Sequence, residues 1–558
     1  MRALLAVVAL LLPGCVTLGP AATTPVDEMR LSQVVFDGVL AEALPFTADD
    51  GATLDVWIFR PEGATDVPII INFSPYWHNL APPAASGGDA FSLYLIDHFV
   101  PRGYAVALVS ARGTGLSEGC FSIGGDREVE DMDQLLDFLG EQPWTNGNMA
   151  ATGKSYDGTM AQGLLTRNDP RLKTIIPQSP ISEFYKYNYY GGVPYDFGGL
   201  LFNTYYVAET SIVQGVDPFS FTVEPDPATY ERLPTRFCEE ALHVQAAQYH
   251  GALLGDYSSY WQERNYTAKL PDSLSASVFY IHGLQDWNVK PDHMTPWLDE
   301  LYARNVTVKA WLGQWAHDYP HRDDWNATLL RWLDSELKGI DTGIRGEPLV
   351  QVQDTEGVWR HEARWPPMRA APLTLYPTEG ASLVAEPGTG YVRYGDAPGG
   401  VATRSPIGGG FTYLGEPVER AMRIVGSPTF TATVSATGPR ATLAVALLLD
   451  GKVVDQGFLD LAHRNGLDSF EPLVPGESYQ VTVPLYPQDI VVPAGSVLGL
   501  HVSSASPNGA LVSVRPFSAG GLVTLTHGEG TALTLPVIDA DDVEVEARQP
   551  ESLGCWTC

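Results

Sequence analysis

The 558-residue chain is poor in cationic side chains, with 34 Lys and Arg against 66 Asp and Glu and a formal net charge of -32. Nucleic-acid binding depends on cationic side chains that displace counterions from phosphates, so this balance excludes a nucleic-acid-binding protein. The excess of acid favours solubility, and an acidic pocket that attracts cationic substrates is the alternative. Disorder is not expected, because hydrophobic residues make up 44% and charged residues 18% of the chain.

Long apolar runs are missing except near the N-terminus, where Arg2 precedes an apolar run over residues 3–12. A charged end and an apolar stretch of this length are typical of a secretory signal, residues 1–14, and are too short for a membrane-spanning helix. The residues before Cys15 resemble a bacterial lipobox, in which the cysteine carries a lipid. We therefore expect an exported lipoprotein anchored in a membrane through Cys15. Secretion or a periplasmic location without the lipid, and an uncleaved anchor, are the alternatives.

Cysteine is scarce, with five residues in the whole chain. If Cys15 is lipidated, an even number remains in an oxidising compartment, where disulfides form. Cys120 and Cys238 are one candidate pair. The segment Cys555-Trp-Thr-Cys558 has C-x-x-C spacing and lies in a tail over residues 546–558. A local disulfide is expected there, and a redox pair or half of a metal site is the alternative.

The pattern of apolar residues divides the rest of the chain into segments. Small residues, threonine and proline without periodicity predict a tether over residues 15–40. Buried strand patterns alternate with helical periods over residues 41–345, which predicts an α/β domain with a mostly parallel sheet covered on both faces. This alternation stops over about residues 183–269, which predicts a helical cap inserted near the active site. Short alternating runs and turn dipeptides over residues 346–545 predict an all-β sandwich or jelly roll.

The expected elements are short. In the α/β domain, we expect strands over residues 54–59, 67–73, 105–109, 149–152, 174–177, 277–281 and 306–311. Helices are expected there over residues 128–140, 159–165 and 329–338. In the β-rich part, we expect strands over residues 423–434, 442–449, 478–485, 497–502, 511–514 and 522–526.

The segment from Gly153 to Gly158, Gly-Lys-Ser-Tyr-Asp-Gly, follows a predicted strand and leads into a predicted helix. This context is typical of a nucleophile elbow, in which a strained serine points its hydroxyl out above the sheet. A serine hydroxyl needs a base to become a good nucleophile, and the base needs an acid to orient it. We therefore predict Ser155 as a nucleophile of acyl-transfer chemistry.

The acid and the base are expected in that order, each after a later strand. Asp286 and His317 occupy such positions, so Asp286 is predicted to hold the imidazole and His317 to take the proton of Ser155. A turn-forming aspartate and a surface-loop histidine are the alternatives at these positions. Asp292 and His321 are nearby competitors for the two roles.

An oxyanion hole requires hydrogen-bond donors aimed at the charge that develops in the transition state. The elbow itself supplies the backbone N–H of Tyr156. The second donor is expected from the loop after the strand over residues 67–73, where Tyr76 could offer its hydroxyl. A packed aromatic side chain is the alternative for Tyr76.

Several motifs follow one another in a characteristic order: Pro75-Tyr76, Arg112-Gly-Thr-Gly115, Gln142-Pro-Trp144, Gly153 to Gly158, His282 to Val289 and Trp315-Ala-His317. Together they resemble the Xaa-Pro dipeptidyl-peptidase and cocaine-esterase superfamily. The resemblance implies an α/β-hydrolase domain with an inserted helical cap and a jelly-roll C-terminal domain. It also implies a triad of Ser155, Asp286 and His317, with the Tyr76 hydroxyl and the Tyr156 N–H as oxyanion donors.

The Gly-Lys-Ser-Tyr-Asp-Gly-Thr and Asp-Trp-Asn-Val motifs look more like the peptidase branch of this superfamily. That branch implies release of N-terminal Xaa-Pro dipeptides through an acyl-enzyme, without a metal or organic cofactor. The aromatic run that includes Phe184 and Tyr185 is then expected to line a pocket for the proline ring, unless it only packs a subdomain. Glu183 and Asp196 are candidates for binding the substrate amine. A carboxylesterase or amidase for small acyl substrates is the main alternative, and an inactive hydrolase that binds carbohydrate is a third.

Overall fold

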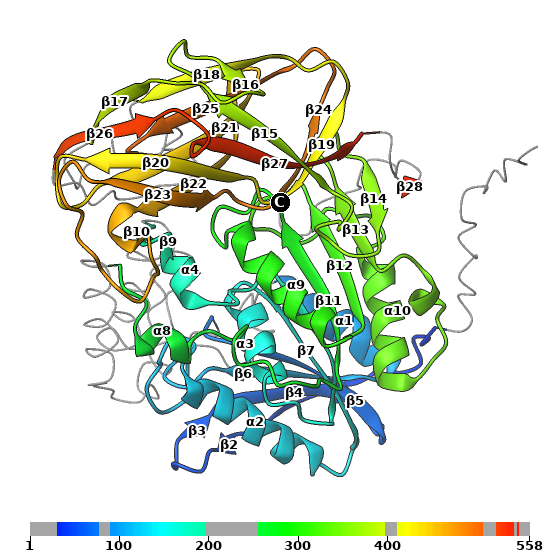
Figure 1. Cartoon of the computed structure of the whole chain (residues 1–558). Helices are drawn as coiled ribbons and strands as arrows, with labels where there is room; N and C mark the ends of the chain where they lie inside the picture. The colour runs from blue at the N-terminus through cyan, green and yellow to red at the C-terminus, as the bar shows by residue number, and fades with distance from the viewer. Residues whose placement is uncertain are drawn as a thin grey trace, which may run out of the picture.

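A computed structural model describes residues 31–76, 90–195, 255–396, 410–505, 520–540 and 544–545. Within these ranges the chain forms an α/β domain and a β-rich domain, which packs on one end of the first (Figure 1). The predicted fold, an α/β domain followed by an all-β region, is confirmed. None of the helices in the described ranges combines the length and apolar character needed to cross a membrane.

The α/β domain is built on a sheet of 11 strands within the described residues. Neighbours from β6 to β13 run parallel, and the pairs at both edges are antiparallel. Parallel strands end at one edge of a sheet, so the loops after β7, β11 and β12 lie at the same edge. In sheet order the strands are β1 (Val39–Ala43), β4 (Val56–Pro61), β6 (Ala105–Ser110), β5 (Val67–Ser74), β7 (Thr145–Lys154), β8 (Leu172–Gln178), β11 (Ser277–Gly283), β12 (Val308–Gly313), β13 (Val350–Gln353), β14 (Trp359–Glu362) and β28 (Glu544–Val545).

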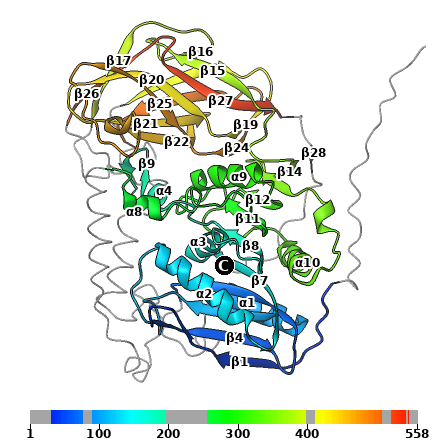
Figure 2. The ribbon, with the colours of Figure 1, turned by 60° about the horizontal axis from the view of Figure 1, so that its bottom comes forward.

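Helices cover both faces of this sheet (Figures 1 and 2). One face carries α2 (Asp126–Gly140), α3 (Tyr156–Leu165) and α9 (Met294–Ala303), and the other carries α1 (Ala90–Phe99) and α10 (Trp325–Lys338). Strand β5 shows how the sequence produces this arrangement, because all of its residues are buried and successive side chains face opposite cores. Ile69 and Ile71 belong to the core under α2 and α3, whereas Ile70 belongs to the core under α1 and α10.

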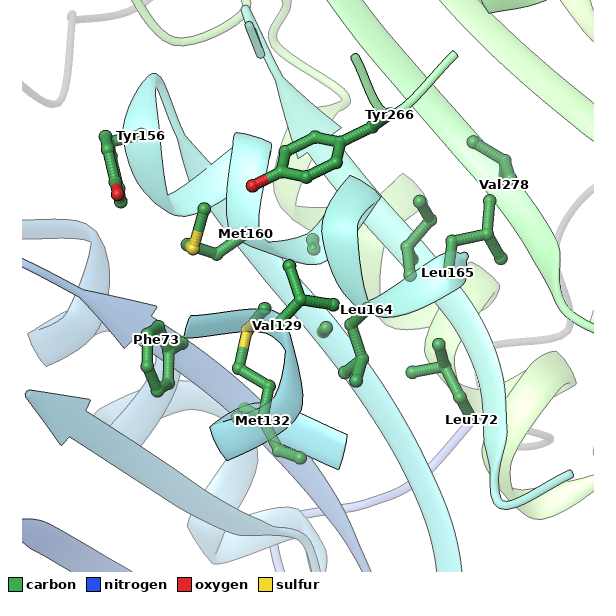
Figure 3. Packing of buried hydrophobic residues seen from close by; sticks show 14 of the residues in the cluster. Phe73, Val129, Met132, Tyr156, Met160, Leu164, Leu165, Leu172, Tyr266 and Val278 are labelled. Carbon is green, nitrogen blue, oxygen red and sulfur yellow. The ribbon is translucent and has the colours of Figure 1, made fainter. Parts of the chain in front are cut away.

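The first of these cores brings the helix after the predicted elbow against its neighbours. Figure 3 shows Met160 and Leu164 of α3 packed near Met132 of α2, with Phe73 at the end of β5 close by. All of these side chains are buried. Such dense packing fixes the position of α3 relative to the sheet, and therefore the position of the turn that precedes the helix.

The described ranges also show differences from the expected elements. Helices α1 and α9 were not predicted. The predicted domain boundary after residue 345 falls before β13 and β14, which continue the large sheet: Ala310 of β12 pairs with Val350 of β13. The sheet therefore extends beyond the part of the sequence in which strands and helices alternate.

The β-rich domain consists of two antiparallel sheets with a shared core. Strand β20 alternates between buried and half-buried residues, with Phe430, Ala432 and Val434 in this core. The larger sheet contains β15 (Ala371–Pro377), β16 (Leu383–Val384), β17 (Tyr391–Asp396), β19 (Met422–Gly426), β20 (Thr429–Ala436), β23 (Ser478–Pro484), β24 (Gln488–Val492), β26 (Gly521–Thr526) and β27 (Ala532–Asp539). The smaller contains β18 (Phe411–Pro417), β25 (Val497–Ser503), β21 (Thr442–Leu449) and β22 (Lys452–Asp460).

Two local predictions in this domain are tested by the backbone. The expected hairpin turn at Asp450-Gly451 is confirmed: Leu449 pairs with Lys452, and the two turn residues have φ of 50° and 76°. The single strand expected over residues 423–434 is wrong, because β19 ends at Gly426, which has φ of 98°, and β20 begins only at Thr429. The jelly-roll topology of the domain stays a prediction.

Only the ends of the predicted cap lie in the described residues. They contain α4 (Phe184–Asn188), β9 (Tyr189–Tyr190), β10 (Val193–Pro194) and α8 (Ser259–Glu263), with α4, β9 and β10 next to the β-rich domain (Figure 1). The predictions for Asp196, the middle of the cap, the signal and tether up to residue 30, and the tail fall outside the described residues. Cys120 is disulfide-bonded. The other cysteines of the chain, Cys15 and Cys238 among them, fall outside the described residues, so the disulfide partner of Cys120 falls outside them as well.

Candidate active site

Ser155 lies in the turn between β7 and α3 with φ of 61° and ψ of -124°. A positive φ is costly for a residue with a side chain and persists only where the surroundings impose it. Here the Ser155 N–H donates to the carbonyl of Gln178 at 2.9 Å, and the Ser155 carbonyl accepts from the N–H of Thr159 at 2.9 Å. The strained serine of a nucleophile elbow is therefore present where the sequence predicts it.

The two glycines of the motif have a steric role. Gly158 follows Ser155 by three residues, one more than in a Gly-x-Ser-x-Gly pattern. A Cβ at Gly153 would lie 2.2 Å from the Cβ of Asp157, and a Cβ at Gly158 would lie 2.8 Å from the carbonyl oxygen of Gly153. Both positions therefore require glycine, because the first turn of α3 lies directly against the end of β7.

Asp286, after β11, and His317, after β12, form a hydrogen-bonded pair. The Asp286 side chain is fully buried, and its Oδ2 lies 2.7 Å from His317 Nδ1. Its Oδ1 accepts the backbone N–H groups of Asn288 and Val289, each at 2.9 Å. A carboxylate can only accept, so the Nδ1 of His317 must carry the donated proton, which leaves its Nε2 able to take another.

Electrostatics favours an ionised acid in this pair. Burial alone would raise the pKa of the Asp286 carboxyl, but the facing His317, through its charge and its hydrogen bond, holds that pKa below its usual range. Behind it, His282 is fully buried, and its Nε2 lies 2.9 Å from the carbonyl oxygen of Val289. Burial lowers the pKa of His282, so this imidazole stays neutral and supports the turn that contains Asp286.

The loops that carry Ser155 and His317 meet through a cation–π contact. The Nζ of Lys154 lies 4.5 Å from the centre of the Tyr319 ring.

Ser155 is half-buried, and the His317 side chain is 18% exposed. In the described part of the chain, no hydrogen bond joins the Ser155 hydroxyl to His317. Catalytic hydrogen bonds of this kind are often long in ligand-free enzymes and tighten with substrate.

The competing residues have other surroundings. His321 is exposed and lies 3.0 Å from the carboxylate of Asp318. Burial raises the pKa of the Asp292 carboxyl to about 6, although the charges of Lys290 and Lys186 oppose this shift. Of the acids and bases considered from the sequence, the structure pairs Asp286 with His317.

Tyr156 is anchored by its hydroxyl as well as by the helix that it begins. The hydroxyl donates to Glu128 Oε2 at 2.5 Å and accepts the backbone N–H of Gly124 at 2.6 Å. Glu128 is fully buried and also accepts from the N–H and hydroxyl of Ser122, both at 2.9 Å. Burial raises the pKa of the Glu128 carboxyl. Figure 3 shows the Tyr156 ring beside α3. The predicted oxyanion N–H therefore belongs to a residue whose backbone begins α3 and whose hydroxyl is held by Glu128 and Gly124.

Tyr76, two residues after β5, is half-buried, and its N–H donates to the hydroxyl of Ser74 at 3.0 Å. It lies in the surroundings of Tyr187: burial raises the pKa of the Tyr187 phenol well above its usual range, and Tyr76, Tyr195 and Asp286 raise it further. The Tyr187 hydroxyl donates to Asn288 Oδ1 at 2.9 Å. Tyrosine hydroxyls therefore gather beside the acid–base pair.

The residues expected to line a pocket are mostly core residues. Phe184 and Tyr185 are 1% and 0% exposed. The Phe184 ring lies 6.1 Å from that of Tyr156, and the Tyr185 hydroxyl donates to the carbonyl of Gly255 at 2.5 Å. Glu183 Oε2 lies 3.5 Å from Lys186 Nζ. The structure therefore gives these residues packing and ion-pair partners, and their contact with substrate stays a prediction.

Some residues that surround Asp286 have roles that the sequence does not reveal. His282 and Asn288 belong to the His282 to Val289 motif, which marks the segment without distinguishing the role of each residue. Tyr187 comes from α4, far from Asp286 in the sequence, and no local pattern indicates their proximity.

The chain matches two family models and has relatives among known proteins. Residues 50–319 match the family model described as X-Pro dipeptidyl-peptidase (S15 family), and residues 342–517 match the X-Pro dipeptidyl-peptidase C-terminal non-catalytic domain. A relative from Bacillus anthracis, provisionally named a Xaa-Pro dipeptidyl-peptidase, is 28% identical over 91% of this chain and 88% of its own. The Xaa-Pro dipeptidyl-peptidase of Lactiplantibacillus plantarum is 30% identical over 47% of this chain and 33% of its own.

Solved structures show the same fold over nearly the whole chain. An α-amino acid ester hydrolase has a TM-score of 0.69 at 18% identity, covering 94% of this chain and 99% of its own. A CocE/NonD family hydrolase from Staphylococcus aureus has a TM-score of 0.69 at 16% identity, covering 90% and 94%. With the matched family models and the serine elbow, these likenesses lead to one conclusion. The chain belongs to the Xaa-Pro dipeptidyl-peptidase and cocaine-esterase superfamily of α/β-hydrolases, and it is a serine hydrolase.

Proposed function

We propose that the protein is a serine peptidase that releases Xaa-Pro dipeptides from the N-termini of peptides. Ser155 is the nucleophile, His317 the base and Asp286 the acid that orients it. The observation that carries this proposal is the 2.7 Å contact between His317 and the buried Asp286, at the sheet edge where Ser155 occupies a strained elbow. The peptide substrate is supported by the match of residues 50–319 to the S15 family model.

The chemistry proceeds in two acyl-transfer steps. His317 Nε2 takes the proton of Ser155 as its oxygen attacks the carbonyl carbon of the proline residue, and a tetrahedral intermediate forms. The backbone N–H of Tyr156 and the hydroxyl of Tyr76 donate to its oxyanion. His317 then gives its proton to the leaving amine, and the dipeptide remains as an ester on Ser155. Water, deprotonated by His317, releases the dipeptide and restores the serine.

Asp286 acts through the imidazole. Its Oδ2 keeps the Nδ1 proton in place, and its negative charge stabilises the imidazolium that forms during each proton transfer. Its Oδ1 is fixed by the N–H groups of Asn288 and Val289. The acid is therefore oriented before substrate arrives, so little reorganisation is needed during the reaction.

The test compares two substrates side by side with purified protein. Gly-Pro-p-nitroanilide and p-nitrophenyl butyrate are assayed for kcat/KM, with Ser155→Ala as the control, and a fluorophosphonate probe is used to label the nucleophile. We expect turnover of the anilide and labelling of Ser155, both lost in Ser155→Ala. A preference for the ester by orders of magnitude would replace the peptidase with an esterase. Failure of the probe to label Ser155 would reject serine catalysis itself.

We also propose that the protein is exported and held at a membrane by a lipid on Cys15. The disulfide at Cys120 supports export, because disulfides persist in oxidising compartments. Detergent-phase partitioning of the full-length protein from cells, compared with a Cys15→Ser variant, tests the anchor. Equal partitioning of both into the aqueous phase would contradict it.

A further inference from the structure

Glutamine side chains connect the loops that carry Asp286 and His317. The Nε2 of Gln285, the residue before Asp286, donates to Gln314 Oε1 at 3.0 Å. Gln314 in turn is bound to Gln353 of β13: its N–H donates to Gln353 Oε1 at 2.9 Å, and its Nε2 donates to the Gln353 carbonyl at 3.0 Å. Primary amides both donate and accept, so they can form such a chain without a buried charge.

The β-rich domain supplies the last member of the chain. Gln488, the first residue of β24, is fully buried. Its Nε2 donates to the backbone carbonyl of Leu284 at 2.8 Å, and its Oε1 accepts from Gln285 Nε2 at 3.4 Å. We call Gln285, Gln314, Gln353 and Gln488 the glutamine bridge.

The glutamine bridge acts on the turn that presents the acid. Strands β11 and β12 end side by side, with Gly283 paired to Gly313. The turn after β11 is then fixed by Leu284 N–H to the Gly313 carbonyl at 2.7 Å and Gln285 N–H to the Trp315 carbonyl at 3.1 Å. The Leu284 carbonyl accepts the hydrogen bond that Gln488 Nε2 donates. Loss of that partner would leave a buried carbonyl unpaired and release one side of the turn.

A second contact from the β-rich domain holds the other side of Asp286. The ring of Trp287 lies 5.4 Å from the ring of Tyr486, in a buried cluster with Tyr190 and Tyr195. The Trp287 carbonyl also accepts the hydroxyl of Tyr195. The residues on both sides of Asp286, Leu284 and Trp287, are thus bound by the stretch from Tyr486 to Gln488.

We propose that the glutamine bridge positions Asp286 for catalysis and that Gln488, in the β-rich domain, is a positioning residue. This proposal rests on the proposed Ser155 chemistry. The matched family describes its C-terminal domain as non-catalytic, and the contacts above assign that domain a part in orienting the acid. Gln488 acts through Leu284 and Gln285 rather than on substrate.

The test variant is Gln488→Met, which keeps the length of the side chain and removes the amide. We expect kcat on Gly-Pro-p-nitroanilide to fall by about 10- to 100-fold, because small displacements of catalytic groups have effects of this size, while KM changes little. The rate of Ser155 labelling by the fluorophosphonate should fall in parallel. In an Asp286→Asn background the same substitution should cause no further loss, because the acid that it orients is already absent.

Ile490→Val is the matched control. Ile490 lies on the same strand, is 2% exposed and belongs to the core of the β-rich domain, away from the glutamine bridge. It should lower thermal stability without changing kcat. If Gln488→Met keeps the kcat and labelling rate of the wild type, or raises only KM, the positioning role is overturned while serine catalysis stands. If the wild type itself is not labelled at Ser155, the proposed function fails, and the positioning role fails with it.

Discussion

Asp286→Asn is the most informative single substitution, because the structure dictates how the new side chain must sit. Asp286 Oδ1 accepts two backbone N–H groups, and Oδ2 faces His317 Nδ1. Asparagine has one oxygen, and only that oxygen can keep the two N–H bonds. Its NH₂ group must therefore face His317, where it can only donate.

This arrangement imposes the tautomer of the His317 imidazole that cannot act as the base. With a donor facing it, Nδ1 of His317 must become the acceptor, and the proton moves to Nε2, which then cannot take the proton of Ser155. We expect kcat to fall on the order of 10⁴-fold, which corresponds to about 5 kcal/mol in the activation free energy. Folding should be nearly unaffected, since the bonds to Asn288 and Val289 survive.

The assay is kcat and KM on Gly-Pro-p-nitroanilide, with thermal unfolding measured in parallel. Asp292→Asn is the control: it makes the same chemical change at the competing acid, which is not hydrogen-bonded to His317, and should leave kcat near the wild-type value. Activity of Asp286→Asn within about tenfold of the wild type, or a larger loss in Asp292→Asn, would refute the assignment of the acid.

Three further predictions follow from the site and its surroundings. Tyr76→Phe should lower kcat by about 10²- to 10³-fold with little change in KM, as for loss of one oxyanion donor; steady-state kinetics with unchanged values would reject that role. Tyr156→Phe leaves Glu128 Oε2 and a backbone N–H without their bonds, so urea unfolding should show a loss of about 1 to 3 kcal/mol for each group; an unchanged midpoint would contradict this. Burial lowers the pKa of Lys290 from 10.5 to about 8, so as the pH rises the folded state releases this proton before the unfolded state does. The free energy of unfolding of the wild type should therefore rise between pH 8 and 10.5 relative to that of Lys290→Met, by about 3 kcal/mol. Parallel curves of unfolding free energy against pH would show that Lys290 does not titrate in this way.

The proposed catalytic residues could be chosen from the sequence because each lies in a local sequence pattern. Ser155, Asp286 and His317 each lie in a short loop directly after an apolar strand, and the ends of parallel strands meet at one edge. The elbow also requires small residues, as the close approach to Gly153 and Gly158 shows. These signals extend over a few residues and do not require knowledge of distant contacts.

Other features depend on tertiary context or on exceptions to local rules. Helix α9 contains Pro296 in its first turn, a position that helices tolerate but that interrupts a helical pattern in the sequence. The run over residues 423–434 contains Gly426 and Pro428, and the turn there divides it into β19 and β20 although strand-forming residues continue on both sides. The contact of Gln488 with Leu284 joins residues about 200 positions apart, so no spacing in the sequence could predict it.

The short strand β28 bears on how the chain avoids self-association. It pairs with β14, Arg360 with Val545, and so occupies what would otherwise be an open border of the 11-stranded sheet within the described residues. Unpaired strand borders are templates for intermolecular pairing. A chain shortened before residue 544 would expose β14, and we expect it to aggregate on storage even where the chemistry at the ends of β7, β11 and β12 survives.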